Sequence, residues 1–350
     1  EVKQSNLCSE ITLPTNDERT AVCCLSSVNL EHFDEWSKDD KFIDDLVTML
    51  DNVLEHFIEN AVDLNSLGGY NANYERFRKH IKEGKEGFTK AAYSAYRERS
   101  IGLGAMGFHS YLQNQNIPFE GIFSTGINYK LFKFIKGAAV LASRRLAVLR
   151  GEAPDISNSG LRNCHLLAVA PNASSSIICG GTSPSIEPIR ANVFTHKTLS
   201  GSYKVKNKNL EKLINKKVTD PKKRKKVWQD ISDNRGSIQE LKLFTKEEKE
   251  IFKTADEINQ IWVVEHAYKR QEFICQSQSV NLFFILPDST QDQEQHNEYL
   301  QYVSDVHWYG ANKLKSLYYF RSDAAKAAEN VNIKVPRIKL DEVECIACEG

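Results

Sequence analysis

The clearest pattern of apolar positions in the chain is a helical stripe over residues 40–61. Apolar residues recur there every three or four positions, which places them on one face of an α-helix. Similar patterns predict further helices over residues 88–114, 124–150, 246–272 and 292–314. The stripe of the first helix consists of Phe42, Ile43, Leu46, Val47, Leu50, Val53, Leu54, Phe57 and Ile58.

Short apolar runs between these helices predict strands at residues 21–30, 166–170, 278–285 and 315–320. Strands that alternate with long helices are typical of an α/β fold with parallel strand pairing. The glycine-rich residues 101–107 interrupt one predicted helix. We interpret these glycines as sites of close helix packing rather than as a phosphate-binding loop, because no strand is predicted before them.

The character of the chain changes after about residue 323. Hydrophobic periodicity fades there, and Ala, Lys, Asn and Glu dominate. We therefore predict a folded domain over residues 1–322 and a flexible tail over residues 323–350.

Candidate catalytic residues already appear within the first ten residues of the chain. This position predicts that the chain is either a fragment or one half of a protein that another polypeptide completes.

Composition and charge exclude several classes of partner. The 350 residues are 41% hydrophobic and 26% charged, as in ordinary globular proteins. Lys and Arg together number 46, as do Asp and Glu, so no net charge favours nucleic acid or membranes. The Lys-rich segment 205–226 has no interleaved aromatic residues, so we interpret it as a solvated surface insertion.

No apolar run reaches the roughly 20 residues of a membrane helix, and no signal peptide pattern is visible. We expect a cytoplasmic protein.

The eight cysteines are scattered along the chain, which is unlike a small disulfide scaffold. This usage is typical of a reducing compartment with a few reactive thiols. Cys345 and Cys348 form a Cys-x-x-Cys pair near the end. The pair supplies only two of the four ligands of a structural zinc, and no neighbouring His or Cys completes the set. We therefore predict a redox dithiol and no metal site.

The segment Asn6-Leu7-Cys8-Ser9-Glu10 is the strongest candidate for catalytic chemistry. Side chains alternate along an extended segment, so Asn6, Cys8 and Glu10 are expected on one face. This arrangement would put a thiol between a hydrogen-bonding amide and a proton acceptor. The simpler interpretation is a half-buried strand with a core cysteine, since free Cys often packs like a small hydrophobe.

A second candidate site follows the predicted strand at residues 166–170. It consists of Pro171, Asn172, Ala173, Ser174 and Ser175. Asn172 is a plausible helix N-cap and a glycine at position 180 a plausible stop. Backbone N–H groups at such a helix start, together with hydroxyl groups, can bind an anion. A capped turn with surface serines explains the same residues equally well.

Taken together, these motifs resemble the catalytic large subunit of class I ribonucleotide reductase. The resemblance extends over residues 6–348 and rests on the order and spacing of five motifs. They are Asn6-x-Cys8-x-Glu10; Cys23 ahead of Leu25-Ser26 and Asn29-Leu30; Pro171 to Ser175; Tyr318-Tyr319; and Cys345 with Cys348. The family fold is a ten-stranded α/β barrel, with the radical cysteine on a central loop. The resemblance implies that this chain forms about half of that barrel.

The resemblance also implies roles for the amino-terminal motifs. Cys8 is expected to become a thiyl radical that removes hydrogen from C3′ of a ribonucleoside diphosphate. Glu10 is expected to take the proton of the 3′-hydroxyl, and Asn6 to hold the substrate by hydrogen bonds. The 2′-hydroxyl then leaves as water. Cys23 matches one member of the thiol pair that supplies the two electrons.

Further roles follow for the remaining motifs. Pro171, Asn172, Ala173, Ser174 and Ser175 match the loop that holds the substrate phosphates. Tyr318 and Tyr319 match the pair that relays the radical from a small subunit. Cys345 and Cys348 match the shuttle that thioredoxin or glutaredoxin reduces. The resemblance implies no cofactor in this chain and a metal-bearing radical cofactor in the small subunit.

The tyrosine pair carries a structural expectation of its own. Adjacent side chains in a regular strand point to opposite faces, whereas a relay needs the two rings close together. We therefore expect the backbone at Tyr318 and Tyr319 to leave regular strand geometry at a bulge or a strand end. The simpler interpretation is that both rings only pack, because Tyr is common in strands.

The sequence departs from the family in what it lacks. Nothing in it matches the ATP-cone, the specificity site, the other half-barrel or the partner cysteine of Cys23, and neither Cys24 nor Cys164 can be assigned as that partner. We therefore expect no activity from this chain without an amino-terminal-half chain and a small radical subunit. Two alternatives stay open: a related radical enzyme with a different radical generator, and a non-enzymatic redox or interaction module.

Overall fold

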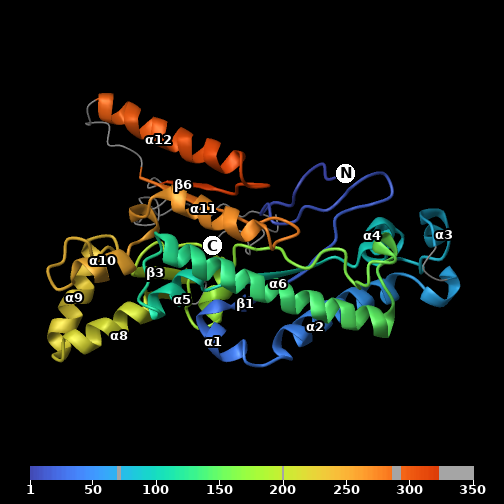
Figure 1. Ribbon diagram of the computed structural model, residues 1–350, viewed down its shortest axis with the longest axis horizontal. Helices are drawn as coiled ribbons and strands as arrows, with labels where there is room; N and C mark the ends of the chain where they lie inside the picture. The colour runs from blue at the N-terminus through green and yellow to red at the C-terminus, as the bar shows by residue number, and fades with distance from the viewer. Residues whose placement is uncertain (69–71, 199–200, 286–292, 323–350) are drawn as a thin grey trace. The chain divides into compact units, whose positions relative to one another are not determined.

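The fold is known from a computed structural model, which describes residues 1–68, 72–198, 201–285 and 293–322. Its chain divides into two compact units (Figure 1). The first unit comprises Glu1–Ala105, Gly126–Ala170 and Ala267–Ser279, and the second comprises Met106–Thr125, Pro171–His266 and Val280–Gly350. Among the helices that the structure describes, none combines the length and apolar character of a membrane-spanning segment.

The first unit is built on extended segments that lie side by side. Strand β1 (Cys24–Asn29) pairs with β2 (Ile101–Met106). Parallel bridges then join Leu103 to Leu167 and Val169 to Gln278. The pairing of residues far apart in the chain confirms the predicted parallel α/β arrangement for these segments.

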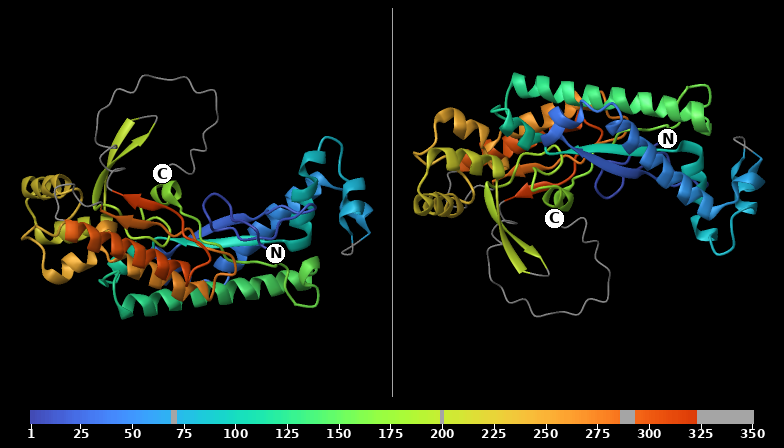
Figure 2. Two further views of the ribbon diagram at one scale, coloured as in Figure 1. Left: turned by 90° about the horizontal axis from the view of Figure 1, so that it is seen from above. Right: turned by 90° about the horizontal axis from the view of Figure 1, so that it is seen from below.

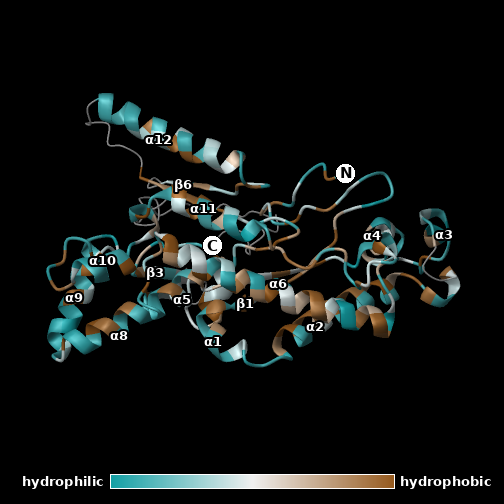
Figure 3. Cartoon of the chain, in the orientation of Figure 1, coloured by the Kyte–Doolittle hydropathy of each residue, from teal (hydrophilic) through white to brown (hydrophobic). Residues whose placement is uncertain are grey.

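Helix α2 (Phe42–Ala61) follows the predicted stripe and packs against β1 and α4 (Thr89–Glu98). Its hydrophobic residues appear as brown bands between teal ones in Figure 3. Other elements of this unit are η1 (Leu30–His32), α1 (Phe33–Trp36), η2 (Leu64–Leu67), α3 (Tyr74–Lys79), η3 (Glu86–Phe88) and η4 (Pro154–Ile156). Helix α6 (Ile122–Arg150) begins in the second unit and continues through the first.

The prediction of helix packing at residues 101–107 was wrong. Residues 101–106 form β2, a strand in which every residue is buried. A Cβ atom on Gly104 would lie 2.6 Å from the carbonyl oxygen of Ala168. The glycines thus serve the close approach of neighbouring strands, a role that the helical interpretation overlooked.

The second unit contains a helical cluster and two strand pairs. Strands β3 (Val193–Thr198) and β4 (Gly201–Lys206) form an antiparallel pair (Figure 2). Strands β5 (Leu282–Phe284) and β6 (Phe320–Ser322) pair in parallel, with Leu282 opposite Phe320. The helices are α5 (Phe108–Asn114), α7 (Ala173–Ile178), α8 (Lys208–Lys217), α9 (Pro221–Asp233), α10 (Lys246–Ile251), η5 (Ala255–Glu257), α11 (Gln260–Gln271, continuing into the first unit) and α12 (Gln293–Ala311).

The Lys-rich segment is a solvated surface, as predicted. Leu210 and Ile214 of α8 and Trp228 and Ile231 of α9 point into one hydrophobic cluster, whereas most lysines of these helices are exposed. The predicted helix 246–272 is interrupted, because Thr254 caps a separate 3₁₀ turn between α10 and α11. The predicted strand at 315–320 is shorter and shifted, since β6 begins only at Phe320.

Candidate active site

The Cys8 segment is a tight turn and not the extended strand that the sequence suggested. The N–H of Ser9 donates to the carbonyl oxygen of Asn6 at 3.0 Å, and Ser9 has a left-handed φ of 64°. The side-chain oxygen of Asn6 accepts from the N–H of Ile11 at 3.0 Å. Leu7, which precedes Cys8, is 68% exposed and does not pack in the core. The turn places Cys8 half-buried and Glu10 fully buried.

The extended segment 277–279, far along the chain from Cys8, holds the turn in place. The N–H of Ser277 donates to the carbonyl oxygen of Glu10 at 2.9 Å. The hydroxyl of Ser279 donates to the carbonyl oxygen of Cys8, and its Oγ lies 3.2 Å from Oε2 of Glu10. The thiol-bearing turn and the carboxylate therefore share one buried anchor.

Cys23 lies in the same unit, next to the hydrophobic cluster of Ile11, Leu13 and Ala168. The side-chain amide of Gln276 donates to Cys23 Sγ at 3.2 Å and accepts from the N–H of Thr12 at 3.3 Å. Burial raises the pKa of the Cys23 thiol to about 12, against the opposing hydrogen bond from Gln276. Cys23 is thus protonated at neutral pH.

The pKa of the neighbouring Cys275 thiol is shifted in the opposite direction, below its ordinary value. Its sulfur accepts the backbone N–H groups of Leu166 and Leu167 at 3.1 and 3.2 Å. Burial raises the pKa of this thiol, but the hydrogen bond with His165 and the backbone donors outweigh burial and lower the pKa to about 6. The pKa of the Cys275 thiol is therefore well below that of Cys23.

Sequence reasoning missed the residues that anchor the site. Gln276, Ser277, Gln278 and Ser279 are each at most 1% exposed, although all four are polar. Two of these residues, Gln278 and Ser279, open the predicted strand 278–285, and polar residues in a buried strand are unusual because buried polar groups need partners. That signal was present in the sequence.

The candidate phosphate loop, Pro171 to Ser175, lies in the second unit. Asn172 occupies the predicted N-cap position of α7, but its φ is 54° and its side chain makes no capping hydrogen bond. Ser174 and Ser175 are exposed. Helix α7 ends at Ile178 with Cys179 as its C-cap, and the predicted stop, Gly180, follows with a left-handed φ of 90°.

The second unit also holds the tyrosine pair. The ring centroids of Tyr318 and Tyr319 are 3.9 Å apart, and β6 begins only at the following residue. The N–H of Tyr318 donates to the carbonyl oxygen of Val280 at 2.9 Å, and the N–H of Tyr319 donates to the side-chain oxygen of Asn281 at 3.2 Å. The expected departure from regular strand geometry is therefore confirmed.

A buried carboxyl group, Glu187, is linked to Tyr319 through hydrogen bonds with Asn281. Glu187 is 5% exposed, and the side-chain amide of Asn281 donates to it. Burial raises the pKa of Glu187 to about 7, although Arg190 and Asn281 oppose the shift. The guanidinium of Arg321 stands 4.6 Å from the centroid of the Tyr319 ring.

The predicted redox pair, Cys345 and Cys348, lies outside the described residues.

Comparison with known proteins decides the family. The sequence model of the family described as "Ribonucleotide reductase, barrel domain" matches residues 1–159 and 153–320. The chain belongs to this ribonucleotide reductase family. It is 42% identical over 353 aligned positions to the ribonucleoside-diphosphate reductase large subunit of Invertebrate iridescent virus 3, covering all of this chain and 50% of that protein. It is also 40% identical to the putative large subunit of Frog virus 3, covering 100% of this chain and 56% of that protein.

A solved ribonucleotide reductase has the same fold. The alpha subunit of the class Id enzyme of Actinobacillus ureae superposes with a TM-score of 0.72 at 35% sequence identity, over 92% of this chain and 53% of that subunit. The prediction of part of a ribonucleotide reductase α/β barrel is thus confirmed. The chain spans only about half the length of these two viral relatives.

Proposed function

We propose that this chain forms part of the catalytic barrel of a ribonucleoside-diphosphate reductase and supplies its radical cysteine, Cys8. The observation that carries the proposal is the anchored turn, in which the backbone of Cys8 and the carboxylate of Glu10 are bound to the same buried hydroxyl of Ser279. A reactive thiol needs a fixed position and a nearby proton acceptor, and this turn offers both.

In the proposed reaction, the Cys8 thiyl takes the hydrogen atom from C3′ of a ribonucleoside diphosphate, and Glu10 takes the proton of the 3′-hydroxyl. Asn6 donates a hydrogen bond to the substrate. The 2′-hydroxyl leaves as water, with a proton from a thiol. Cys23 suits this step because its raised pKa keeps the S–H proton in place at neutral pH.

Each turnover oxidises two thiols to a disulfide, with Cys23 as one of them, and Cys8 returns its hydrogen atom to C3′, which restores the thiyl radical. Its partner cysteine belongs to the amino-terminal half of the large subunit. Cys345 and Cys348 then reduce this disulfide by thiol exchange and are themselves reduced by thioredoxin or glutaredoxin. Pro171, Asn172, Ala173, Ser174 and Ser175 hold the substrate phosphates.

Tyr318 and Tyr319 carry the oxidising equivalent from a small subunit toward Cys8. A metal-bearing radical cofactor in that subunit supplies the equivalent, and we propose that this chain itself holds no cofactor. The close approach of the two rings supports a relay role, because a proton that moves together with the electron can pass between two side chains only at close range.

Reconstitution tests the proposal. We expect no reduction of ribonucleoside diphosphates by this chain with the small subunit alone, and reduction once an amino-terminal half is added. Within that assembly, Cys8→Ser should abolish turnover without weakening partner binding, whereas Cys179→Ser, at an exposed thiol, should leave turnover intact. Turnover by the Cys8→Ser variant would contradict the proposal, and a non-enzymatic module would show no turnover in any assembly.

The tail cysteines are tested with two reductants. Cys345→Ser or Cys348→Ser should stop turnover that thioredoxin drives but leave slow turnover with dithiothreitol, because a small dithiol reaches the internal disulfide directly. Equal losses with both reductants would exclude a shuttle role.

A further inference from the structure

The Cys8 turn is bound by the extended segment 277–279, whose own position is fixed by backbone hydrogen bonds. The N–H of Ser279 donates to the carbonyl oxygen of Val169 at 2.9 Å, and the N–H of Val169 donates to the carbonyl oxygen of Ser277 at 3.1 Å. Ser279 is 0% exposed. Its hydroxyl therefore cannot move far from the turn, and its main freedom is rotation about the Cβ–Oγ bond.

Two acceptors compete for this hydroxyl when Glu10 is ionised. The carbonyl oxygen of Cys8 and Oε2 of Glu10 are both within hydrogen-bonding distance of Ser279 Oγ. A hydroxyl has one proton to donate and lone pairs with which to accept. With an ionised Glu10, only one of the two contacts can be a full hydrogen bond at any moment.

The competition ends when Glu10 carries a proton. The carboxylic acid can then donate to Ser279 Oγ, while Ser279 donates to the carbonyl oxygen of Cys8. Both contacts are satisfied at once, in a chain from the acid through the hydroxyl to the turn. Hydrogen bonds in such a buried chain strengthen one another.

We propose that Ser279 is a positioning residue that couples proton uptake by Glu10 to the placement of the Cys8 turn. The inference rests on the proposed function, in which the proton comes from the 3′-hydroxyl of the substrate. Ser279 keeps its own proton throughout, and its hydroxyl only rotates. Because the chain of hydrogen bonds is complete only after proton transfer, Ser279 favours the reacting state over the substrate-bound ground state.

A set of variants at position 279 separates the hydroxyl from the bulk of the side chain. Thr keeps the hydroxyl, and Val has nearly the same shape without it. In the complete reductase that contains this chain, we expect Ser279→Ala and Ser279→Val to lower kcat about 10- to 100-fold with little change in KM. Ser279→Thr should keep kcat within about fivefold of the native value.

Ser143→Ala is a matched control for the loss of a buried serine hydroxyl. Ser143 is also 0% exposed in the first unit, and its hydroxyl donates to Asn163 at 2.9 Å. We expect this variant to lower thermal stability but to leave kcat unchanged. The comparison shows whether a fall in kcat reflects the Cys8 turn or only a weaker fold.

Two results would overturn the inference. One is a kcat within about twofold of native for Ser279→Ala, and the other is an equal loss in the Thr and Val variants. If the larger side chains prevent folding, the kcat and KM of Ser279→Ala decide alone. The failure of the proposed function is distinguishable, because it would appear as turnover by Cys8→Ser, whatever the Ser279 variants do.

Discussion

The rings of Tyr318 and Tyr319 approach to a centroid distance of 3.9 Å at an interplanar angle of 31°, although the two residues are adjacent in the chain. In a regular strand their side chains would point to opposite faces. The residues instead immediately precede β6, where Tyr318 binds Val280 and Tyr319 binds Asn281 through their backbone N–H groups. The loss of strand geometry is what brings the rings together.

This geometry predicts the effect of removing either hydroxyl. Tyr318→Phe and Tyr319→Phe should each stop turnover of the assembled reductase, because phenylalanine cannot undergo the proton-coupled oxidation of a relay. Both variants keep the ring, so thermal unfolding and nucleotide binding should change little. Tyr203→Phe, at a residue that is 55% exposed, is the control and should retain activity. A near-native rate in either relay variant would exclude that tyrosine from the relay.

Glu187 predicts a pH dependence of stability in the second unit. Burial raises its pKa from 4.5 to about 7. The folded chain therefore binds this proton more tightly than the unfolded chain, so the free energy of unfolding should fall as pH rises from about 4.5 through about 7. A shift of this size corresponds to about 3 kcal/mol in all.

The measurement is denaturant unfolding at several pH values between 5 and 8. Glu187→Gln mimics the protonated acid and should flatten the profile, so that the variant exceeds the native chain in stability at the alkaline end. Glu211→Gln removes an exposed carboxylate that pairs with Lys206 at 3.3 Å and should leave the profile unchanged. An unaltered slope in Glu187→Gln would assign the pH dependence to other groups.

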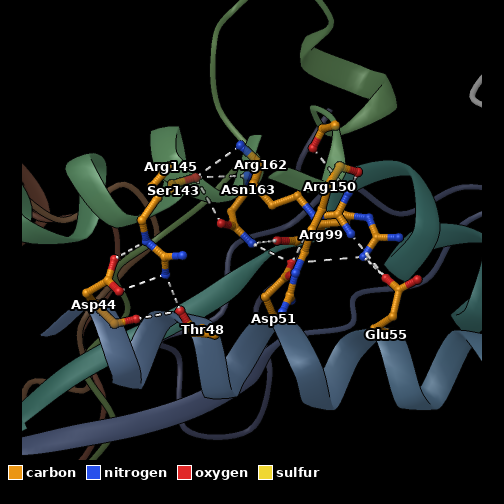
Figure 4. Close-up of polar contacts among 11 residues, drawn as sticks. Asp44, Thr48, Asp51, Glu55, Arg99, Ser143, Arg145, Arg150, Arg162 and Asn163 are labelled. Carbon is orange, nitrogen blue, oxygen red and sulfur yellow. Dashed lines mark hydrogen bonds and ion pairs between the residues drawn. The ribbon is translucent and has the colours of Figure 1, made fainter. Parts of the chain in front are cut away.

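An ion network between the acidic residues of α2 and the arginines that face them predicts a large loss of stability from a single substitution (Figure 4). Asp51 is 0% exposed and contacts Arg150 at 2.7 Å and Arg162 at 3.2 Å. Asp51→Asn would leave these guanidinium groups without their buried counter-charge, at a cost of about 3–5 kcal/mol. Denaturant unfolding measures this cost.

Asp44 on the same helix is the matched control. It pairs with Arg145 at 2.7 Å, but the two side chains are 29% and 42% exposed. Asp44→Asn should therefore cost at most about 1 kcal/mol. Similar losses in the two variants would mean that burial does not set the strength of this network.

Two glycines predict opposite effects of the same substitution. Gly104→Ala should destabilise the chain by about 1–3 kcal/mol, because the new Cβ would lie 2.6 Å from the backbone oxygen of Ala168. Gly137→Ala, inside α6 with nothing within 4 Å of its Cβ position, should stabilise it by about 0.5–1 kcal/mol. Thermal unfolding of both variants tests the strand assignment of residues 101–106, since a helical Gly104 would tolerate alanine.

The sequence by itself determined the features that depend on residues close together in the chain. The apolar stripe of residues 40–61 predicted α2 to within two residues at its start, because helical periodicity is a local property. The adjacency of Tyr318 and Tyr319 likewise implied that their rings could approach only outside a regular strand. The order of short motifs pointed to the family for the same reason.

Only the tertiary structure decided which distant segments meet. The glycines at positions 102 and 104 fit a helix or a strand locally, and their burial among neighbouring strands settles the choice. Ser9 takes a left-handed conformation, so the alternation expected for Asn6, Cys8 and Glu10 does not apply. Ser279 contacts Glu10 across 269 positions of sequence. Such a partner is set by the pairing of strands and not by local pattern, because the free energy that fixes it comes from burial and hydrogen bonds between segments.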